Sequence, residues 1–294
     1  MSTPRFLTLP PGVNRTAIET SRGRFATLEA LPGAGVTERC PALLVPGYTG
    51  SKEDFIAVLQ TLAASGRRVV AVDMRGQYES DGPDDPSAYG RAALGEDITA
   101  LQEALGPEPV HLVGHSFGGL VTREAVLAAR VPPASFTLMS SGPAALTGPA
   151  AVRARALRDA IPRLGLSAIW AISMEPGYVE RGVRSDIVDF LRARTLGNSA
   201  AGLVCMAREL LTAPDRVDEL AKHAEDTGLG ILVLYGEDDD VWDPRVQAAM
   251  AERLDAAKVV IPSAAHSPAV EAPETTASAL TDFWNRAERD LLYP

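Results

Sequence analysis

Residues 111–121, HLVGHSFGGLV, place a serine and a histidine between glycines directly after a short apolar run. Such a run, followed by glycines and a helix-like segment, is typical of a buried strand that turns sharply into a helix. The glycines flanking Ser116 remove Cβ clashes, so a tight turn can lift its hydroxyl above the sheet at a helix N-terminus. We interpret Ser116 as a candidate nucleophile, and the alternative is a serine that caps the helix.

Short apolar strands alternate with helix-like segments on both sides of this stretch. We expect strands at 42–47, 67–73, 110–114, 135–141, 230–236 and 257–262, and helices at 52–65, 90–105, 116–130, 244–255 and 273–290. Continuous apolar strands of this length indicate a mainly parallel sheet that is covered by helices on both faces. Before them, 13–20 and 24–31 alternate in polarity and are predicted to form an antiparallel hairpin.

Residues 145–227 interrupt this alternation, because they contain helical patterns punctuated by proline and glycine but no strand-like run. One α/β domain with a helical insert is the simplest description. We therefore predict a first core part at 1–144, a helical cap at 145–227 and a second core part at 228–294. The sheet should be twisted and mostly parallel, with about eight strands.

Composition excludes several function classes. The formal net charge of −10 argues against nucleic acid or an anionic membrane as a partner. No apolar stretch approaches the roughly 20 residues of a membrane span, and the N-terminal residues lack a secretory pattern. Cys40 and Cys205 are far apart in no metal-ligand spacing, which suits reduced thiols in the cytoplasm. We expect no metal, no cofactor and a small-molecule substrate as the partner. The sequence allows a homodimer without requiring one.

A serine hydroxyl needs a base, and four histidines are present. His111 lies inside an apolar strand, His115 points aside from its neighbour Ser116, and His223 lies in a charged segment. His266 follows the last expected strand in a loop of small residues, SAAHSP, so it is the predicted base. The alternative is a histidine that caps the following helix.

An acid should orient that imidazole, and an oxyanion hole needs two backbone N–H groups. Phe117, after the nucleophile, supplies one amide, and Tyr48 in the loop after strand 42–47 is the best-placed candidate for the second. The acid should come from residues 235–244, YGEDDDVWDP. Several acidic residues lie there, and position alone does not show which of them contacts the imidazole. The acids there are Glu237, Asp238, Asp239, Asp240 and Asp243.

Together these stretches resemble the α/β-hydrolase superfamily in its cap-bearing branch with a serine nucleophile. The resemblance covers roughly 41–143 and 229–290. It rests on GHSFGG, on AVDMRGQYES (71–80), which is similar to a D-x-R-G-x-G-x-S loop, on GEDDDVWDP, and on SAAHSPAVEAPE (263–274). It implies an α/β-hydrolase fold, the chain order Ser116, Asp239, His266 for the catalytic residues, and Asp239 as the acid.

Two stretches depart from the family pattern. The oxyanion loop begins Pro46-Gly47 where the family often has His-Gly, and Gln77 and Tyr78 stand where a glycine is common. The stretch PGYTGSKEDF (46–55) is similar to a subgroup of bacterial hydrolases whose substrates it does not reveal. A serine at 116 disfavours the branches with an aspartate nucleophile.

The leading hypothesis is a serine hydrolase that cleaves an ester, thioester or lactone of a small apolar molecule through an acyl-enzyme. The cap would roof the pocket, with Trp170, Met174 and Trp242 as candidate walls; the alternative for each is a place in the hydrophobic core. Carbon–carbon hydrolysis, perhydrolysis and acyl transfer could use the same groups. A protein that only binds a small ligand is the alternative from another class.

Overall fold

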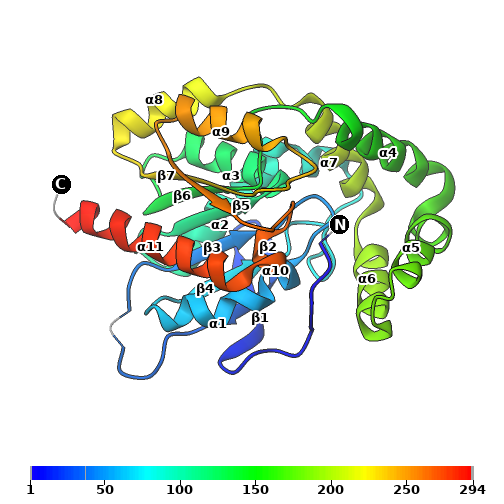
Figure 1. The fold of residues 1–294 in the computed structure, drawn as a ribbon, viewed down its shortest axis with the longest axis horizontal. Coiled ribbons are helices and arrows are strands. Elements are labelled where there is room, and N and C mark those ends of the chain that lie inside the picture. Colours follow the sequence, from blue (N-terminus) through cyan, green and yellow to red (C-terminus); the bar gives the residue numbers. More distant parts are fainter. Residues whose placement is uncertain (1, 37, 293–294) are drawn as a thin grey trace.

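One eight-stranded sheet runs through the computed structural model, which describes residues 2–36 and 38–292 (Figure 1). The strands are β1 (Val13–Thr20), β2 (Gly23–Ala30), β3 (Ala42–Val45), β4 (Val69–Val72), β5 (His111–His115), β6 (Ser135–Met139), β7 (Ile231–Gly236) and β8 (Ala257–Ile261). Their order across the sheet is β1-β2-β4-β3-β5-β6-β7-β8. β1 and β2 form the predicted antiparallel hairpin, and β3 to β8 pair in parallel. The predicted α/β fold is confirmed.

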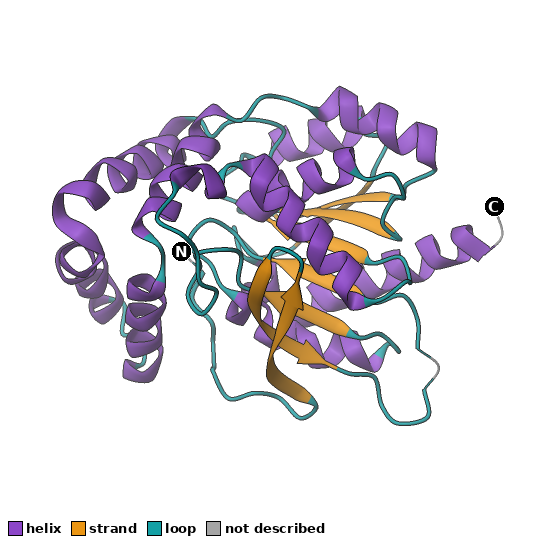
Figure 2. Ribbon diagram, turned by 180° about the vertical axis from the view of Figure 1, so that it is seen from behind, coloured by secondary structure: helices purple, strands orange, loops and turns teal. Residues whose placement is uncertain are grey.

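Helices cover both faces of this sheet (Figure 2). One face carries α1 (Ile56–Ala64), which follows the short 3-10 helix η1 (Lys52–Phe55), together with α10 (Pro268–Glu271) and α11 (Pro273–Leu292). The other carries α2 (Arg91–Leu105), which follows the 3-10 helix η2 (Pro86–Tyr89), and α3 (Phe117–Ala128), α8 (Val217–Thr227) and α9 (Pro244–Arg253).

Alternate side chains of each central strand enter the two cores. In β3, Leu43 and Val45 pack toward α2 and α3, whereas Ala42 and Leu44 pack toward α1 and α11. All four are fully buried. Burial on both faces requires apolar residues at every position, which is why the strands appear in the sequence as uninterrupted apolar runs.

The segment 145–227, predicted as a cap, is helical and contains no strand. It comprises α4 (Gly148–Ile169), the π-helical turn η3 (Trp170–Met174), α5 (Glu175–Glu180), α6 (Ser185–Gly197), α7 (Ala200–Thr212) and α8. Figure 1 shows α4 to α7 beyond one end of the sheet, whereas α8 packs against α3 and α9. The helices that stand away from the sheet are therefore α4 to α7, and we use "cap" for these below.

Two further expectations concern the state of the cysteines and the presence of membrane-spanning helices. Cys40 is half-buried and Cys205 is buried, and both thiols are free. No helix within the described ranges combines the length and the apolarity that crossing a membrane requires.

Candidate active site

Ser116 lies on the turn between β5 and α3. Its backbone adopts φ 56° and ψ −120°, in a region that residues other than glycine rarely occupy. The Ser116 amide donates to the Met139 carbonyl at 2.9 Å, and Ser141 Oγ donates to the Ser116 carbonyl at 2.8 Å. The Ser116 side chain makes no capping hydrogen bond to α3. The reading of Ser116 as a helix cap is therefore wrong, and its hydroxyl is left for another partner.

Two glycines let neighbouring backbone come close to this turn. A Cβ at Gly118 would collide with the carbonyl oxygens of Val45 and Pro46, and a Cβ at Gly47 would lie 3.0 Å from Ser116 Cβ. A side chain is therefore excluded at Gly118, and one at Gly47 would press against Ser116. The loop after β3 therefore passes directly beside Ser116.

The structure brings Ser116, His266 and Asp239 into one hydrogen-bonded chain. His266 Nε2 lies 2.9 Å from Ser116 Oγ, and His266 Nδ1 lies 3.0 Å from Asp239 Oδ1. The three side chains come from the carboxyl ends of β5, β7 and β8, which meet at one edge of the sheet. This arrangement lets Nδ1–H donate to the carboxylate while Nε2 accepts the proton of the serine.

Asp239 is held as an anion by several donors. The Val241 amide donates to Oδ1 at 2.9 Å, and Gln247 Nε2 donates to Oδ2 at 2.9 Å. Burial raises the pKa of Asp239, but hydrogen bonds from His266, Val241 and Gln247 and the charge of His266 outweigh burial, so the pKa lies below its ordinary value. The carboxylate is thus ionised where it meets the imidazole.

The other acids of residues 235–244 face elsewhere. Glu237 and Asp238 are exposed, and Glu237 accepts from the Ser263 amide at 3.3 Å. Asp240 is exposed, and Asp243 is the N-cap residue of α9. Among these acids only Asp239 is buried. Burial, which a run of acids does not reveal in a sequence, distinguishes it.

His115, next to the serine, has a different environment from His266. Its ring is buried, and Nε2 donates to the His266 carbonyl at 2.7 Å. Burial, with a smaller effect of the neighbouring His266 charge, lowers the pKa of His115 to about 3. His115 is therefore neutral at physiological pH and supports the backbone of His266 rather than contacting Ser116 Oγ.

The two amides predicted for the oxyanion hole flank Ser116. The Phe117 amide is the first of α3, and the Tyr48 amide follows Gly47 in the loop beside Ser116. Neither amide has a backbone acceptor among the described residues. Both N–H groups are consequently free to donate to an oxygen beside Ser116.

Gln77, noted in the sequence as a departure from the family pattern, holds the Tyr48 loop. Its side chain is fully buried, and Nε2 donates to the carbonyls of Gly47 at 2.8 Å and Tyr48 at 3.1 Å. Its Oε1 accepts from the Met74 amide at 3.1 Å. The orientation of the peptide unit that carries the Tyr48 amide thus depends on this side chain.

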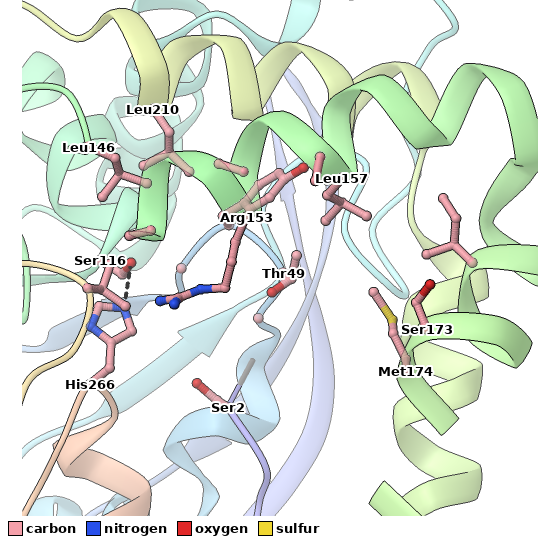
Figure 3. Close-up of a pocket in the computed structure, with 18 of the residues that line it drawn as sticks. Ser2, Thr49, Ser116, Leu146, Arg153, Leu157, Ser173, Met174, Leu210 and His266 are labelled. Carbon is pink, nitrogen blue, oxygen red and sulfur yellow. Dashed lines mark hydrogen bonds between the residues drawn. The ribbon is translucent and has the colours of Figure 1, made fainter. Parts of the chain in front are cut away.

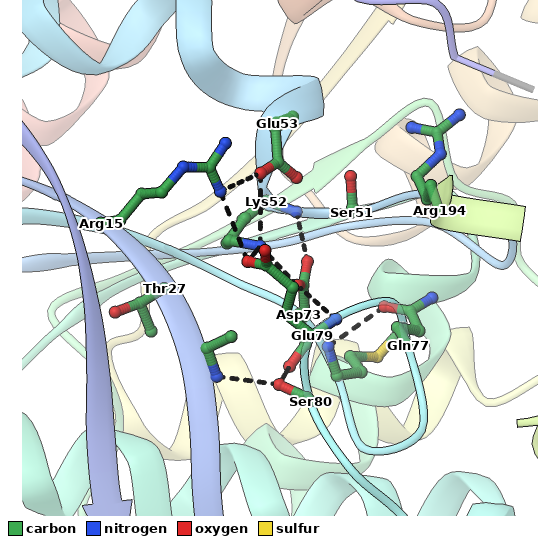
Figure 4. A network of polar contacts seen from close by, with 12 residues as sticks. Arg15, Thr27, Ser51, Lys52, Glu53, Asp73, Gln77, Glu79, Ser80 and Arg194 are labelled. Carbon is green, nitrogen blue, oxygen red and sulfur yellow. Dashed lines mark hydrogen bonds and ion pairs between the residues drawn. The ribbon is translucent and has the colours of Figure 1, made fainter. Parts of the chain in front are cut away.

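A buried charge network anchors the same loop a few residues further on (Figure 4). Lys52 Nζ lies 2.7 Å from Asp73 Oδ2 and 2.6 Å from Glu79 Oε2, and the Lys52 amide donates to Asp73 Oδ1 at 2.7 Å. Burial raises the pKa of Asp73 to about 7, with the Glu53 carboxylate adding to the rise and Lys52 opposing it. The loop after β3 is therefore bound to the loop after β4.

A cavity of about 560 Å³ opens beside Ser116 and His266 (Figure 3). One side is the loop after β3, and the opposite side is formed by α4, η3 and α7 of the cap. Most of the wall is apolar, formed by Leu146, Ala150, Ala154, Leu157, Ala160, Ile169, Leu210 and Val241. Such a cavity suits a small ligand with an apolar body.

Of the three walls expected from the sequence, the structure places one at this cavity. Met174 lines it, but Trp170 and Trp242 do not, so that part of the prediction is wrong. Trp170 is buried inside the cap, stacked on Tyr178 with ring centroids 5.8 Å apart. Trp242 is buried against Gly142, where a Cβ would collide with its indole ring. Both rings fill the interior of the protein instead.

Sequence reasoning missed the main wall of the cavity and one support of the acid. Wall positions on α4 include 150, 153, 154, 157, 160 and 164, a spacing of three or four residues that marks one helical face. That periodicity was a usable signal. No signal pointed to Gln247, because its contact with Asp239 arises only from the packing of α9.

One group of described side chains outside the cavity has metal-like spacing. Donor atoms of Cys40, His111 and Glu288 lie within 4.8 Å of one another, at the start of β5 and away from Ser116. His111 Nε2 contacts Glu288 Oε1 at 3.0 Å, and its Nδ1 lies 2.8 Å from Ser135 Oγ. Arg67 pairs with Glu288 at 2.9 Å. The carboxylate is thus already neutralised, which disfavours a cation there.

Known proteins with related sequences share only part of this chain. A proline iminopeptidase of Lactobacillus helveticus is 37% identical over 87 residues, which are 29% of this chain and 30% of that protein. One from Lacticaseibacillus rhamnosus is 28% identical over 97 residues, or 33% of each chain. The chain therefore matches about a third of the length of these curated relatives.

Solved structures match over nearly the whole length. A thermophilic esterase from Thermogutta terrifontis, solved with malate bound, has a TM-score of 0.71 and 25% identity, covering 93% of this chain and 99% of that one. A carboxylesterase structure from Nitrososphaera gargenis has a TM-score of 0.72 at 20% identity, covering 94% and 100%. At 20% identity, the likeness to the Nitrososphaera gargenis structure shows a shared fold alone.

A family-level match covers most of the chain. Residues 42–279 match the family described as the Alpha/beta hydrolase family. This range begins at β3 and ends within α11, so it includes the serine turn, the loop of Asp239, the loop of His266 and the cap. With the sheet order and the helical insert already described, the chain belongs to the alpha/beta hydrolase family.

Proposed function

We propose that this hydrolase cleaves a carboxylic ester, thioester or lactone of a small, largely apolar molecule through an acyl-enzyme. Ser116 Oγ attacks the carbonyl carbon while His266 Nε2 takes its proton. Asp239 holds the imidazole in the required tautomer and stabilises the imidazolium. The amides of Tyr48 and Phe117 donate to the tetrahedral oxyanion.

The second half of the reaction reverses the proton path. The bond from the acyl carbon to the ester oxygen or thioester sulfur breaks while the imidazolium protonates that atom. An alcohol or thiol leaves, or a hydroxyl stays on the acyl chain of an opened lactone, and the acyl group remains on Ser116. Water then enters, His266 takes one of its protons, and the hydroxide adds to the acyl carbon. The carboxylic acid leaves as the proton returns to Ser116.

One observation carries this proposal: the hydrogen-bonded chain from Ser116 through His266 to Asp239, with distances of 2.9 Å and 3.0 Å, at the wall of the cavity. The sharp turn at Ser116, with its positive φ, and the free amides of Tyr48 and Phe117 support the same reaction. A protein that only binds a ligand has no need of a relay in this order, so we prefer the enzyme.

A peptidase is the second candidate, because the partial relatives are proline iminopeptidases. The charges at the cavity favour an ester. Asp54 is neutralised by Arg194 at 2.8 Å. The side chain of Arg153 is 57% exposed, and among the described residues its hydrogen bonds and ion pairs are those to Asp240, at 3.4 and 3.5 Å. A protonated peptide amine would meet a cation here. We expect no turnover of L-proline p-nitroanilide by the purified chain.

The direct test combines a covalent probe with turnover. A fluorophosphonate should label Ser116 in the purified protein, as located by peptide mass spectrometry. Ser116→Ala should lose the label and lower kcat for p-nitrophenyl butyrate by at least about a thousandfold. The control Ser21→Ala changes an exposed serine in the β1–β2 turn, and this variant should keep both the fluorophosphonate labelling and the turnover.

Wild-type turnover that survives Ser116→Ala would overturn the mechanism. Absence of both labelling and turnover in the wild-type protein would favour the binding protein instead.

A further inference from the structure

Arg153 is a cation in an otherwise apolar wall of the cavity. It lies on α4, and Figure 3 shows its side chain extending from that helix toward Ser116 and His266. Ala150, Ala154 and Leu157 on the same face of α4 surround it with small or apolar side chains. A long charged side chain is out of place in a wall that serves only to hold hydrocarbon.

The partners of Arg153 leave most of its donors unused. Nη2 lies 3.4 Å from Asp240 Oδ2 and 3.5 Å from the Asp240 carbonyl oxygen, and Nε and Nη1 form no hydrogen bond or ion pair with the described residues. The side chains of Arg153 and Asp240 are 57% and 67% exposed, so solvent screens this pair. A second carboxylate can therefore approach the guanidinium at little cost.

The other formal charge facing the cavity is already compensated. Asp54 lines it, but Asp54 Oδ1 lies 2.8 Å from Arg194 Nη1, and both side chains are buried. Asp239 sits behind the imidazole of His266, with its side chain fully buried. Among the described charged side chains that line the cavity, Arg153 is thus the one whose ion pair is long and open to solvent, although the whole chain carries a formal net charge of −10.

We propose that Arg153 binds a carboxylate of the substrate, so that the preferred substrate is a monoester of a dicarboxylic acid or a similarly charged acyl ester. This inference rests on the ester hydrolysis proposed above. The guanidinium presents paired N–H donors that match the two oxygens of a carboxylate. Because Arg153 points toward Ser116, the charged group belongs to the acyl part near the scissile carbonyl, and the apolar alcohol part fills the remaining wall.

Two butyl esters whose acyl chains have the same number of carbon atoms test this proposal. Butyl butyrate and monobutyl succinate differ only in a carboxylate that replaces the terminal methyl group of the acyl chain. Acid release is followed by pH-stat titration at low ionic strength. We expect the wild-type kcat/KM to be at least about tenfold higher for monobutyl succinate, which corresponds to one charge-assisted pair.

Variants assign that preference to one side chain. Arg153→Met should lower the ratio of kcat/KM for the charged ester to that for the neutral ester by at least about tenfold, mainly through a higher KM for the charged ester. Arg153→Lys should retain an intermediate preference, because it keeps the charge but loses the paired donors. Arg155→Met is the matched control, since Arg155 is an exposed arginine on α4 that does not line the cavity, and it should leave the preference unchanged.

The outcomes separate this inference from the proposed function. If the wild-type enzyme hydrolyses both esters equally, or if Arg153→Met slows both alike, Arg153 does not recognise a substrate carboxylate. If the wild-type enzyme hydrolyses neither ester, ester hydrolysis is the part that fails.

A calorimetric titration decides the binding question without turnover. Ser116→Ala should bind monobutyl succinate at least about tenfold more tightly than Ser116→Ala with Arg153→Met does. Equal affinities in the two proteins would overturn the proposed role of Arg153.

Discussion

His115 and His266 lie side by side, with ring centroids 5.0 Å apart, yet the surroundings give them different chemistry. His266 reaches both Ser116 and Asp239, whereas His115 is enclosed and donates to the carbonyl of His266. Burial lowers the pKa of His115 to about 3. Proximity to Ser116 in the sequence therefore did not indicate which imidazole could accept the serine proton, because the direction of the backbone decides where each ring points.

The buried His115 should make the protein acid-sensitive. An unfolded chain binds a proton at this imidazole near pH 6.5, whereas the folded protein binds it only near pH 3. Acidification between these values therefore favours unfolding, with a contribution of about 1.4 kcal/mol per pH unit in the middle of the window. His115→Gln keeps a side-chain donor and should reduce the slope of unfolding free energy against pH by that amount.

Urea denaturation at pH 6, 5 and 4 measures this slope in both proteins. His223→Gln is the control, because His223 lies on α8 away from Ser116. An unchanged slope in His115→Gln would contradict the assignment of a neutral, buried His115.

At the scale of elements, the loop after β3 and the loop after β4 form one unit. Gln77 holds the carbonyls of Gly47 and Tyr48, and the Lys52–Asp73 pair ties the loops together a few residues further on. Neither loop is a helix or a strand where it meets Ser116, so its conformation depends on these buried polar contacts. Gln77 is thus a positioning residue for the proposed oxyanion hole.

Gln77→Glu should lower kcat while changing KM little. A carboxylate cannot donate to the carbonyls of Gly47 and Tyr48 and repels both, so the Tyr48 amide should turn away from the oxyanion. Loss of one oxyanion donor typically costs about a hundredfold or more in kcat, and we expect a tenfold to hundredfold loss because the amide is misplaced, not removed.

Steady-state kinetics on p-nitrophenyl butyrate check this prediction. The control Gln60→Glu makes the same change at an exposed position of α1 and should be neutral. A higher KM with unchanged kcat would assign Gln77 to substrate binding instead.

At the scale of the whole molecule, the cap is joined to the core through buried polar contacts next to the candidate site. Arg194 on α6 pairs with Asp54 at 2.8 Å, and Tyr48 Oη donates to the Leu203 carbonyl of α7 at 2.9 Å. Burial raises the pKa of Asp54, and Arg194 opposes that rise. Tyr48 and Asp54 therefore join the loop after β3 to the cap, so cap placement and site geometry are coupled.

Arg194→Met should destabilise the protein by about 3–5 kcal/mol, because it leaves a buried carboxylate without its partner. The double variant Asp54→Asn with Arg194→Met should recover much of that loss, since neither charge then remains buried. Urea denaturation measures both effects, and Arg192→Met, an exposed arginine on the same helix, should be nearly neutral. Additive losses in the double variant would contradict a direct pair.

The secondary structure was largely predictable, whereas contacts between distant segments were not. Predicted strands at 42–47 and 135–141 correspond to Ala42–Val45 and Ser135–Met139, because burial on both faces leaves an apolar run that needs no context. Trp170 and Trp242 were assigned to the pocket on residue type alone and lie in the interior. Large apolar side chains suit a pocket wall and a core equally, so only packing separates the two.

The sequence by itself determined the alternation of strands and helices, the glycine-lined turn that carries Ser116, the candidate base His266 and an acid-rich loop at 235–244, within which only the family resemblance pointed to Asp239. These features are local, since they depend on periodicity, on glycine and on the residue that follows a strand. Tertiary structure alone decided that the hydroxyl and the imidazole meet at 2.9 Å, that Gln77 holds the Tyr48 loop, and that Arg153 faces the cavity. Each of these is a contact between segments far apart in the chain, and its geometry is set by how the sheet and the cap pack together.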